Sequence, residues 1–524
     1  MPTSNFLALV VAALPAAAGA APLVCDVRDY GAKPDGLTVN TASIQAAIDA
    51  CGDRGGTVYL GAGMWISGTL KLKSHMTLKL DHGAILAGSQ NVADYVPGAS
   101  VGLGDVYGTN LAGEGRSAGL LVARNVEDLT IEGPGTIDGQ SGAFLSNDLH
   151  APRDYSPAAV RNPQGFEAAM HDRNFGPFEI SPAGRPGVLV LIFHTKDVSL
   201  RDLNLRDSPN WTLVLQDIDR AFVSDFSIIN DPLVPNNDGI DCMSCRNVHI
   251  ANGTIRTGDD DIVLVNGEDI TVSGVSMYSR SAAVRLESTQ RSLLDNLTIE
   301  ANRGLAVFAS RPITRPTDGV IFSNIVIRTH LMPGHWWGKA EPIYISVQPC
   351  QGPCAGGVRN VAFSNIEIDA EAGIMIAGAQ GLPVSNVQLR DIRLRMVAPD
   401  ARLSTAIGGN FDRRWTAATP ETGIVTHDIP AISCEDTQAL SLRNIDIDWG
   451  SGLPSYTTAA VDCRHFSGLD IDGLSETGPV PARGAGIVLV DGQGDRLRQL
   501  NLSRTRPQVE RAQDNALANR TKIR

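Results

Sequence analysis

The sequence predicts an all-β fold, a single-stranded right-handed parallel β-helix (a solenoid) with an N-terminal capping helix. Three observations predict it: a pattern that returns mostly every 22 to 29 residues, an alternation of apolar and other residues within each copy, and a polar residue or glycine at the centre of each copy. A step of this length is typical of solenoids, whose units stack and bury a shared core.

Each copy spans nine residues and is interpreted as two short strands with a bend between them. In the copy from Asp197 to Leu205, DVSLRDLNL, apolar residues alternate with others, which is the period of a strand. The centre of most copies is Asn, Asp or Gly, residue types that tolerate the left-handed backbone of a sharp bend. We expect bends at Asp202, Asp225, Asn252, Gly274, Asn296, Asn324, Asn365, Asp391, Asn444, Gly473 and Gln499.

Two other repeat architectures fit the pattern less well. A leucine-rich repeat shares the step but needs a dense Leu pattern and a helix in each unit, and a propeller blade needs about 40 residues or more. The parallel β-helix is therefore the fold that we expect.

The chain outside the repeats has its own features. In NTASIQAAIDAC the apolar residues fall on one face, so we expect a helix from Thr41 to Cys51 that caps one end of the solenoid and covers its core. Insertions rich in Pro, Gly and polar residues, at Gln140 to Gly184 and Pro399 to Pro430, are expected to be loops along one side.

The domain organisation that we expect has three parts. Residues 1–20 are predicted to be a signal peptide, because an apolar run closes in the small residues Ala18-Gly19-Ala20. Residues 21–505 form the parallel β-helix catalytic domain, and 506–524 form a polar C-terminal tail. A secreted or periplasmic protein follows from the leader.

Composition limits the partners. A net charge of −13 argues against nucleic acid, whose binding needs clustered Lys and Arg. No stretch is apolar enough to predict a membrane span, the leader being too short and interrupted by Pro15. We expect a monomer with no cofactor and no resident metal.

Eight cysteines, an even number in a chain with a leader, indicate disulfides. We expect a small loop closed by Cys350 and Cys354 and a bridge between coils from Cys434 to Cys463, which are one repeat step apart. Zinc at Cys242 and Cys245 is the less favoured reading of that spacing, because no His pair sits beside them.

Carboxylates gather in two stretches, NNDGID (Asn236 to Asp241) and TGDDDI (Thr257 to Ile262). Ile240 and Ile262 are 22 residues apart, so Asp238 and Asp260 should occupy equivalent positions on neighbouring coils about 4.8 Å apart, with Asp259 adjacent. Crowded carboxylates favour acid/base catalysis. Turn-capping by each Asp and a Ca²⁺ site are the alternatives.

These motifs resemble glycoside hydrolase family 28, the polygalacturonase-like family, over most of the chain. DVRDYGAKPDG, NTASIQAAIDAC, GTIDG, RPGVLVLIF and SPNW follow in the expected order, and the site motifs stand as Asn236-Asn237-Asp238 and Gly258-Asp259-Asp260. The resemblance implies an inverting hydrolase with Asp259 as general acid and Asp238 and Asp260 activating water. Inversion needs carboxyl groups about 6.5–9.5 Å apart, and one to two coil steps supply roughly 5–10 Å.

Two family features are absent, which makes this a divergent member. The family Gly-His-Gly is replaced by Arg280-Ser281-Ala282, and the family Arg-Ile-Lys, which grips the substrate carboxylate, by Ala306-Val307-Phe308.

Other residues are candidates to bind substrate. Arg285 and Glu287 lie one coil earlier in the same phase as Ala306 and Phe308, so Arg285 could replace the lost charge; a salt bridge with Glu287 is the alternative. A paired-Trp loop would suit a sugar subsite, with packing as its alternative. The full set expected at the substrate is Asn236, Arg285, Glu287, His335, Trp336, Trp337 and Lys339.

The function that we predict is an exported inverting glycoside hydrolase acting on a pectin-related polysaccharide or oligosaccharide, with internal and chain-end attack both left open. The alternatives are a polysaccharide lyase or epimerase on the same fold, and a non-catalytic glycan-binding solenoid. Identifying products from pectic oligosaccharides would separate them.

Overall fold

The structure, a computed structural model, confirms the predicted right-handed parallel β-helix. It describes residues 23–52, 54–96, 119–145, 184–309, 315–332, 337–348, 356–379, 381–413 and 424–513. The predicted signal peptide, Cys350, Cys354, His335 and Trp336 lie outside these residues.

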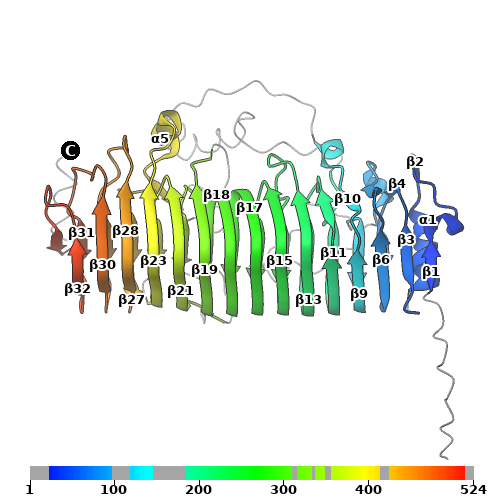
Figure 1. Ribbon diagram of the computed structural model, residues 1–524, viewed down its shortest axis with the longest axis horizontal. Helices are drawn as coiled ribbons and strands as arrows, with labels where there is room; N and C mark the ends of the chain where they lie inside the picture. The colour runs from blue at the N-terminus through cyan, green and yellow to red at the C-terminus, as the bar shows by residue number, and fades with distance from the viewer. Residues whose placement is uncertain are drawn as a thin grey trace, which may run out of the picture.

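Three parallel sheets run along the solenoid, because each coil contributes one strand segment to each sheet and pairs with the coils before and after it. Figure 1 shows the coils following one another from the blue N-terminal end, at α1, to the red C-terminal end, at β32. The named strands of the main sheet pair in parallel.

The first sheet carries the segments that follow the functional turns. It contains β5 (Leu70–Leu72), β8 (Leu121–Arg124), the starts of β11 (Val190–Arg201) and β13 (Leu213–Ile229), β14 (Ile240–Met243), β16 (Ile262–Val265), the ends of β17 (Glu268–Glu287) and β18 (Gln290–Ala309), β20 (Ile343–Val347), β22 (Ile374–Ala377), β26 (Ile432–Glu435), β29 (Val461–Arg464), β31 (Ile487–Val490) and β33 (Val509–Ala512).

The second and third sheets share the longer strands, which bend from one sheet into the other. The second begins with β1 (Val24–Asp26), β3 (Thr57–Leu60), β6 (Met76–Leu80) and β9 (Glu127–Glu132), and the third with β2 (Asp35–Val39), β4 (Gly63–Ser67), β7 (Ala84–Gly88), β10 (Thr136–Asp138) and β12 (Asn204–Arg206). Both continue in β15 (Arg246–Thr257), β19 (Thr317–Thr329), β21 (Val358–Ala370), β23 (Val384–Met396), β28 (Ser441–Trp449), β30 (Asp470–Thr477) and β32 (Arg496–Asn501), with β27 (Thr437–Gln438) in the second.

The predicted bends are confirmed. All eleven central residues, from Asp202 to Gln499, have φ between 52° and 78°, in the left-handed region. Side chains of neighbouring bends also join, since the Asn365 amide donates to the Asn324 side chain at 2.7 Å and Asn444 donates to Asp391 at 2.7 Å. The bends therefore form a ladder along the corner between the second and third sheets.

The core lies inside the three sheets and is aliphatic with a few stacked rings. Phe322 and Phe363, from successive coils, stack with centroids 4.7 Å apart and planes 2° apart. Identical inward positions thus repeat their contacts from coil to coil, which explains why a short sequence pattern encodes a long fold.

The N-terminal end is capped as predicted. The helix α1 spans Thr41–Cys51 and buries Ile44, Ala47 and Ile48 against the solenoid. A disulfide from Cys51 to Cys25 ties the helix to β1. Short 3₁₀ turns, η1 (Val27–Tyr30), η2 (Val92–Asp94) and η4 (Ser141–Phe144), lie at other connections.

Three features differ from the sequence-based expectation. The insertion at 399–430 is not all loop: it contains a helix, α5 (Ala401–Ile407), which begins where the Asp400 side chain caps the amides of Arg402 and Leu403, and an antiparallel hairpin of β24 (Asn410–Asp412) and β25 (Ile424–Thr426). The solenoid continues past residue 505, because β33 pairs with β31.

The cysteines divide into two groups. The predicted Cys434–Cys463 bridge is present, with Cα atoms 4.5 Å apart on neighbouring strands. Cys242 and Cys245 are free and buried.

Candidate active site

The candidate site lies where the chain turns from the third sheet into the first. Ile240 pairs with Ile262, so Asp238 and Asp260, each two residues earlier, stand at equivalent positions on neighbouring coils, as the spacing predicts. We call this series of positions the turn row.

Three carboxylates meet at this point of the turn row. One oxygen from each of Asp238, Asp259 and Asp260 lies within 4.8 Å of the others. Asp238 and Asp260 are 6% and 3% exposed, whereas Asp259 is partly exposed. Asp259 is therefore the carboxyl of the three with the most access to a ligand.

Hydrogen bonds fix the backbone around Asp259. The hydroxyls of Thr257 and Ser279 both donate to the Asp259 carbonyl at 2.6 Å. One coil earlier, the Asn237 side chain accepts from the Gly258 amide at 2.7 Å. These contacts join the two acidic stretches into one rigid turn.

Burial and mutual repulsion change the acidity of the cluster. Burial, followed by the charge of Asp260, raises the pKa of Asp259 to about 7. Burial, followed by the charge of Asp259, raises the pKa of Asp238 well above its usual value. The site thus retains protons at a pH where ordinary carboxyl groups have lost them.

Asp260 has partners that stabilise its negative charge. Its Oδ1 accepts from the Ala282 amide at 3.1 Å, and its Oδ2 lies 3.4 Å from Nη1 of Arg285. Nη2 of the same arginine lies 3.7 Å from Glu287, whose side chain is fully buried. The ion pair that the sequence left as an alternative for Arg285 is therefore present, and it extends to Asp260.

The strand register agrees with the prediction that Arg285 and Glu287 occupy positions equivalent to those of Ala306 and Phe308. Arg285 pairs with Ala306 and Glu287 with Phe308, on the next coil. The arginine lies 5.4 Å from the Phe308 ring centroid. Its guanidinium is nevertheless shared by two carboxylates of the protein, so it does not face the substrate as an uncommitted cation.

A fourth carboxylate belongs to this neighbourhood and was not assigned a role from the sequence. Asp241 is fully buried, no hydrogen bond to either of its carboxylate oxygens is described, and burial and the charge of Asp260 raise its pKa. Its position in the acidic stretch NNDGID was the sequence feature that could have identified it. Asp261 is also buried but accepts from the Thr257 hydroxyl at 2.8 Å.

Asn236, expected at the substrate, lies beside the proposed acid. Its amide nitrogen is 3.5 Å from Asp259 Oδ2, and its oxygen accepts from Arg185 at 3.2 Å. Arg185, which sequence reasoning did not select, also donates to the Pro209 carbonyl at 2.7 Å. It therefore secures the turn that carries Asn236.

Two residues that the sequence placed at the substrate are buried in the structure, to about the same degree as Asp260. Glu287 is 0% exposed, and Lys339 is 2% exposed. Trp337, by contrast, is partly exposed. A sequence pattern cannot distinguish a polar side chain turned inward from one turned to solvent.

Carboxylate groups can also hold a cation, and two groups of described residues have suitable spacing: Asp238, Asp259 and Asp260, and separately Glu435, Asp436 and His465. Arg285 supplies positive charge at the first, and Arg413 forms an ion pair with Glu435 at the second. Each group therefore has one arginine as a charge partner as well as the spacing for a cation.

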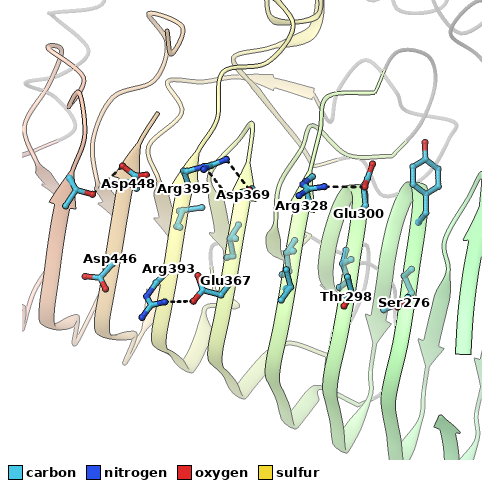
Figure 2. Close-up of a pocket in the computed structure, with 18 of the residues that line it drawn as sticks. Ser276, Thr298, Glu300, Arg328, Glu367, Asp369, Arg393, Arg395, Asp446 and Asp448 are labelled. Atoms are coloured by element: carbon cyan, nitrogen blue, oxygen red, sulfur yellow. Dashed lines mark hydrogen bonds and ion pairs between the residues drawn. The ribbon is translucent and has the colours of Figure 1, made fainter. Parts of the chain in front are cut away.

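A hollow of about 960 Å³ lies elsewhere, on the outer face of the third sheet (Figure 2). Its charged side chains pair between neighbouring strands: Glu300 with Arg328, Glu367 with Arg393, and Asp369 with Arg395. Exposed pairs of this kind are ordinary surface features. The crowded carboxylates of the turn row are the better candidates for chemistry.

Comparisons with known proteins agree with this placement. A family model described as "Glycosyl hydrolases family 28" matches residues 183–406, which include the whole carboxylate cluster. A second, "Rhamnogalacturonase A/epimerase, pectate lyase-like", matches residues 24–151.

Individual relatives match over different lengths. A probable polygalacturonase of Vitis vinifera is 28% identical over 265 residues, 49% of this chain and 47% of that protein, so the chain spans about half the length of that relative. An endo-polygalacturonase of Pectobacterium carotovorum subsp. carotovorum is 26% identical over 400 residues, 71% of this chain and 87% of that protein.

A solved structure shares the fold. The family 28 exopolygalacturonase of Yersinia enterocolitica superposes with a TM-score of 0.56 at 19% identity, covering 93% of this chain and 79% of that one. The part of the chain that carries the carboxylate cluster is therefore similar to glycosyl hydrolases family 28, and the chain shares the fold of a solved member of that family.

Proposed function

We propose that this protein is an exported glycoside hydrolase that cleaves a glycosidic bond in a pectin-related polysaccharide or oligosaccharide, with inversion at the anomeric carbon. The observation that carries the proposal is the meeting of Asp238, Asp259 and Asp260 within 4.8 Å of one another, on two coils. Family relatives named as polygalacturonases support the substrate class.

Asp259 is the general acid in this proposal. Its pKa of about 7 keeps it largely protonated in weakly acidic solution, and its residue is more exposed than Asp238 and Asp260. Proton donation by a positioned side chain is worth about 10²–10⁴ in rate.

Asp260 is the general base, because Arg285 and the Ala282 amide stabilise its negative charge. Asp238, whose pKa is raised by burial and by Asp259, assists in holding the attacking water. The proposal therefore gives the role of base to Asp260, and the raised pKa values of Asp238 and Asp259 favour the protonated forms of those two groups.

The spacing makes the stereochemistry worth measuring. Inverting glycosidases usually hold their carboxyl groups about 6.5–9.5 Å apart and retaining ones about 5–5.5 Å apart. The nearest oxygens here lie within 4.8 Å, which is about one coil step and the short end of the spacing expected from the sequence. Inversion in this protein requires that water enter beside Asp260 rather than between widely separated carboxyl groups.

The test is to incubate the protein with a panel of pectic oligosaccharides, with Asp259→Asn as the matched control, and to identify the products by mass. Hydrolysis is expected from the wild type. It gives products whose summed mass exceeds the mass of the substrate by one water for each bond cleaved. A product with an unsaturated uronate would indicate a lyase. Binding without any product would indicate a glycan-binding solenoid.

A further inference from the structure

The insertion after β23 returns over earlier coils and is fixed there. Its hairpin strand β24 ends at Asp412, which is fully buried, and the neighbouring Phe411 is 2% exposed. In Figure 1, α5 of the same insertion lies above the end of β23. Burial of this extent is that of a docked element rather than of a loose loop.

The residues that receive β24 belong to the turn row. Ala282 pairs with Arg303, and Leu305 pairs with Ile343. Counting two positions back from each strand start, the turn row continues from Asp260 through Ala282 and Arg303 to Glu341. The receiving arginine therefore stands two coils beyond Asp260, about 10 Å along the solenoid axis.

Arg303, on β18 of the solenoid, binds the hairpin at Asp412. Its side chain is fully buried, its Nη2 donates to the Asp412 carbonyl at 2.6 Å, and the same atom lies 3.8 Å from the Asp412 carboxylate. Its guanidinium lies 3.8 Å from the centroid of the Tyr344 ring. A planar cation held on a ring and by two partners leaves the strand little freedom.

Glu341 holds the same strand from the next coil. Its Oε1 accepts from the Asp412 amide at 2.9 Å, and its Oε2 lies 3.4 Å from Nε of Arg303. Gly338 donates its amide to the Asp412 carboxylate at 2.8 Å. Buried charges are stable only when paired and hydrogen-bonded in this way, so the contact is specific to this position.

The hairpin is also held on its far side. The Gln348 side chain donates to the Arg413 carbonyl at 2.8 Å, and Arg413 forms an ion pair with Glu435 on β26. The end of the strand, at Asp412 and Arg413, is thus attached to residues of several coils on the first-sheet side.

We propose that β24, anchored by Arg303, Glu341 and Asp412, is an end wall that stops a polysaccharide chain lying along the turn row two coils beyond the catalytic carboxylates. The inference rests on the proposed function and specifies it further: the enzyme attacks chain ends and releases short products, since only a short part of the substrate fits between Asp260 and the wall.

The first test uses the wild-type protein on a long pectic polysaccharide. The expected result is an accumulation of mono- or disaccharide from the first turnovers, with little fall in viscosity for each bond cleaved. An early ladder of mixed oligosaccharides with a steep fall in viscosity would overturn the proposal.

The second test removes the wall. Residues 401–427 are replaced by a short Gly-Ser linker, together with Arg303→Gln and Glu341→Gln so that no unpaired charge stays buried, and folding is checked by circular dichroism. The variant should release longer products and lower viscosity more for each bond cleaved than the wild type. A folded variant with unchanged products would refute the role of β24. The same variant carrying Asp259→Asn is the control and should release products about 10²–10⁴ times more slowly.

A binding measurement separates this inference from the proposed function. With the Asp259→Asn protein and pectic chains of several defined lengths, calorimetry should give one binding site per chain end at every length. A number of sites that grows with chain length would overturn the end wall even if hydrolysis is confirmed. Absence of products from every substrate, with end binding retained, would instead overturn the hydrolase assignment.

Discussion

The Nη1 atom of Arg285 lies 3.4 Å from Oδ2 of Asp260. Because this arginine also pairs with the buried Glu287, it stabilises negative charge at the proposed base and compensates a second carboxylate behind it. Arg285 is therefore a positioning residue in the proposed mechanism, and its removal should affect the chemistry more than the recognition of one substrate charge.

Substitution of Asp259 tests the general acid. Asp259→Asn should lower kcat by about 10²–10⁴, because the lost proton transfer acts in the transition state, and should leave affinity for oligosaccharides within a few fold. Steady-state kinetics and calorimetry on the same oligosaccharide series measure the two quantities. A large loss of affinity would mean that Asp259 holds the fold or a cation instead.

The pH dependence of turnover reports the same group. Asp259 must be protonated to act as an acid, so kcat should fall as pH rises through about 7, the pKa to which burial and Asp260 raise it. A pH–rate profile with its upper limb near pH 5 would contradict this assignment.

Stability should also depend on pH, and in a defined direction. Because the folded protein binds the Asp259 proton more tightly than the unfolded chain, whose carboxyl has its usual pKa near 3.8, stability should fall as pH rises from about 4 to about 7. One such group contributes a slope of about 1.4 kcal/mol per pH unit in that window. Urea unfolding of wild type and Asp259→Asn at several pH values measures it, and the variant should show the shallower slope.

Removal of Arg285 leaves two carboxylates without their cation. Arg285→Ala should reduce the free energy of unfolding by about 3–5 kcal/mol, as for other broken buried pairs, and lower kcat on charged and neutral glycans alike. Adding Glu287→Gln should recover part of the stability but not the activity, since Asp260 still lacks its partner. A loss confined to uronate substrates would show that Arg285 binds the sugar acid.

The anomeric outcome separates the two classes of mechanism. Proton NMR during the first minutes of hydrolysis should show the product with the configuration opposite to that of the substrate, as expected for inversion. A product that first appears with the substrate's configuration would indicate a covalent intermediate and would make one of the three aspartates a nucleophile.

Much of the fold was predictable because it depends on local and periodic properties. A bend that needs a left-handed backbone selects Asn, Asp or Gly at one position, so the residues from Asp202 to Gln499 could be named from the chain alone. The equivalence of Asp238 and Asp260 followed from the same counting. The helix α5 was missed because its signal, the Asp400 cap, stands inside an insertion that was interpreted as loop from its Pro, Gly and polar residues.

The partners of the site residues were not predictable in the same way. The direction in which Arg285 points depends on Asp260 and Glu287 together, and the burial of Lys339 depends on a loop whose path the repeat does not encode. The anchor of Asp412 joins residues 109 positions apart in the chain, across an insertion of irregular length. Such contacts are decided by tertiary packing, which no short pattern contains.

Because the coils stack uniformly, the distance between two equivalent positions along the solenoid axis is a whole number of coil steps. With about 4.8 Å for each step, the separation between Asp260 and the wall at Arg303 is two coils, and it can change only by a full coil. An insertion or deletion of one complete repeat between them would therefore lengthen or shorten the released product in a discrete step, with the carboxylates themselves unaltered. The number of coils between Asp260 and the wall would in this way set the length of the released product.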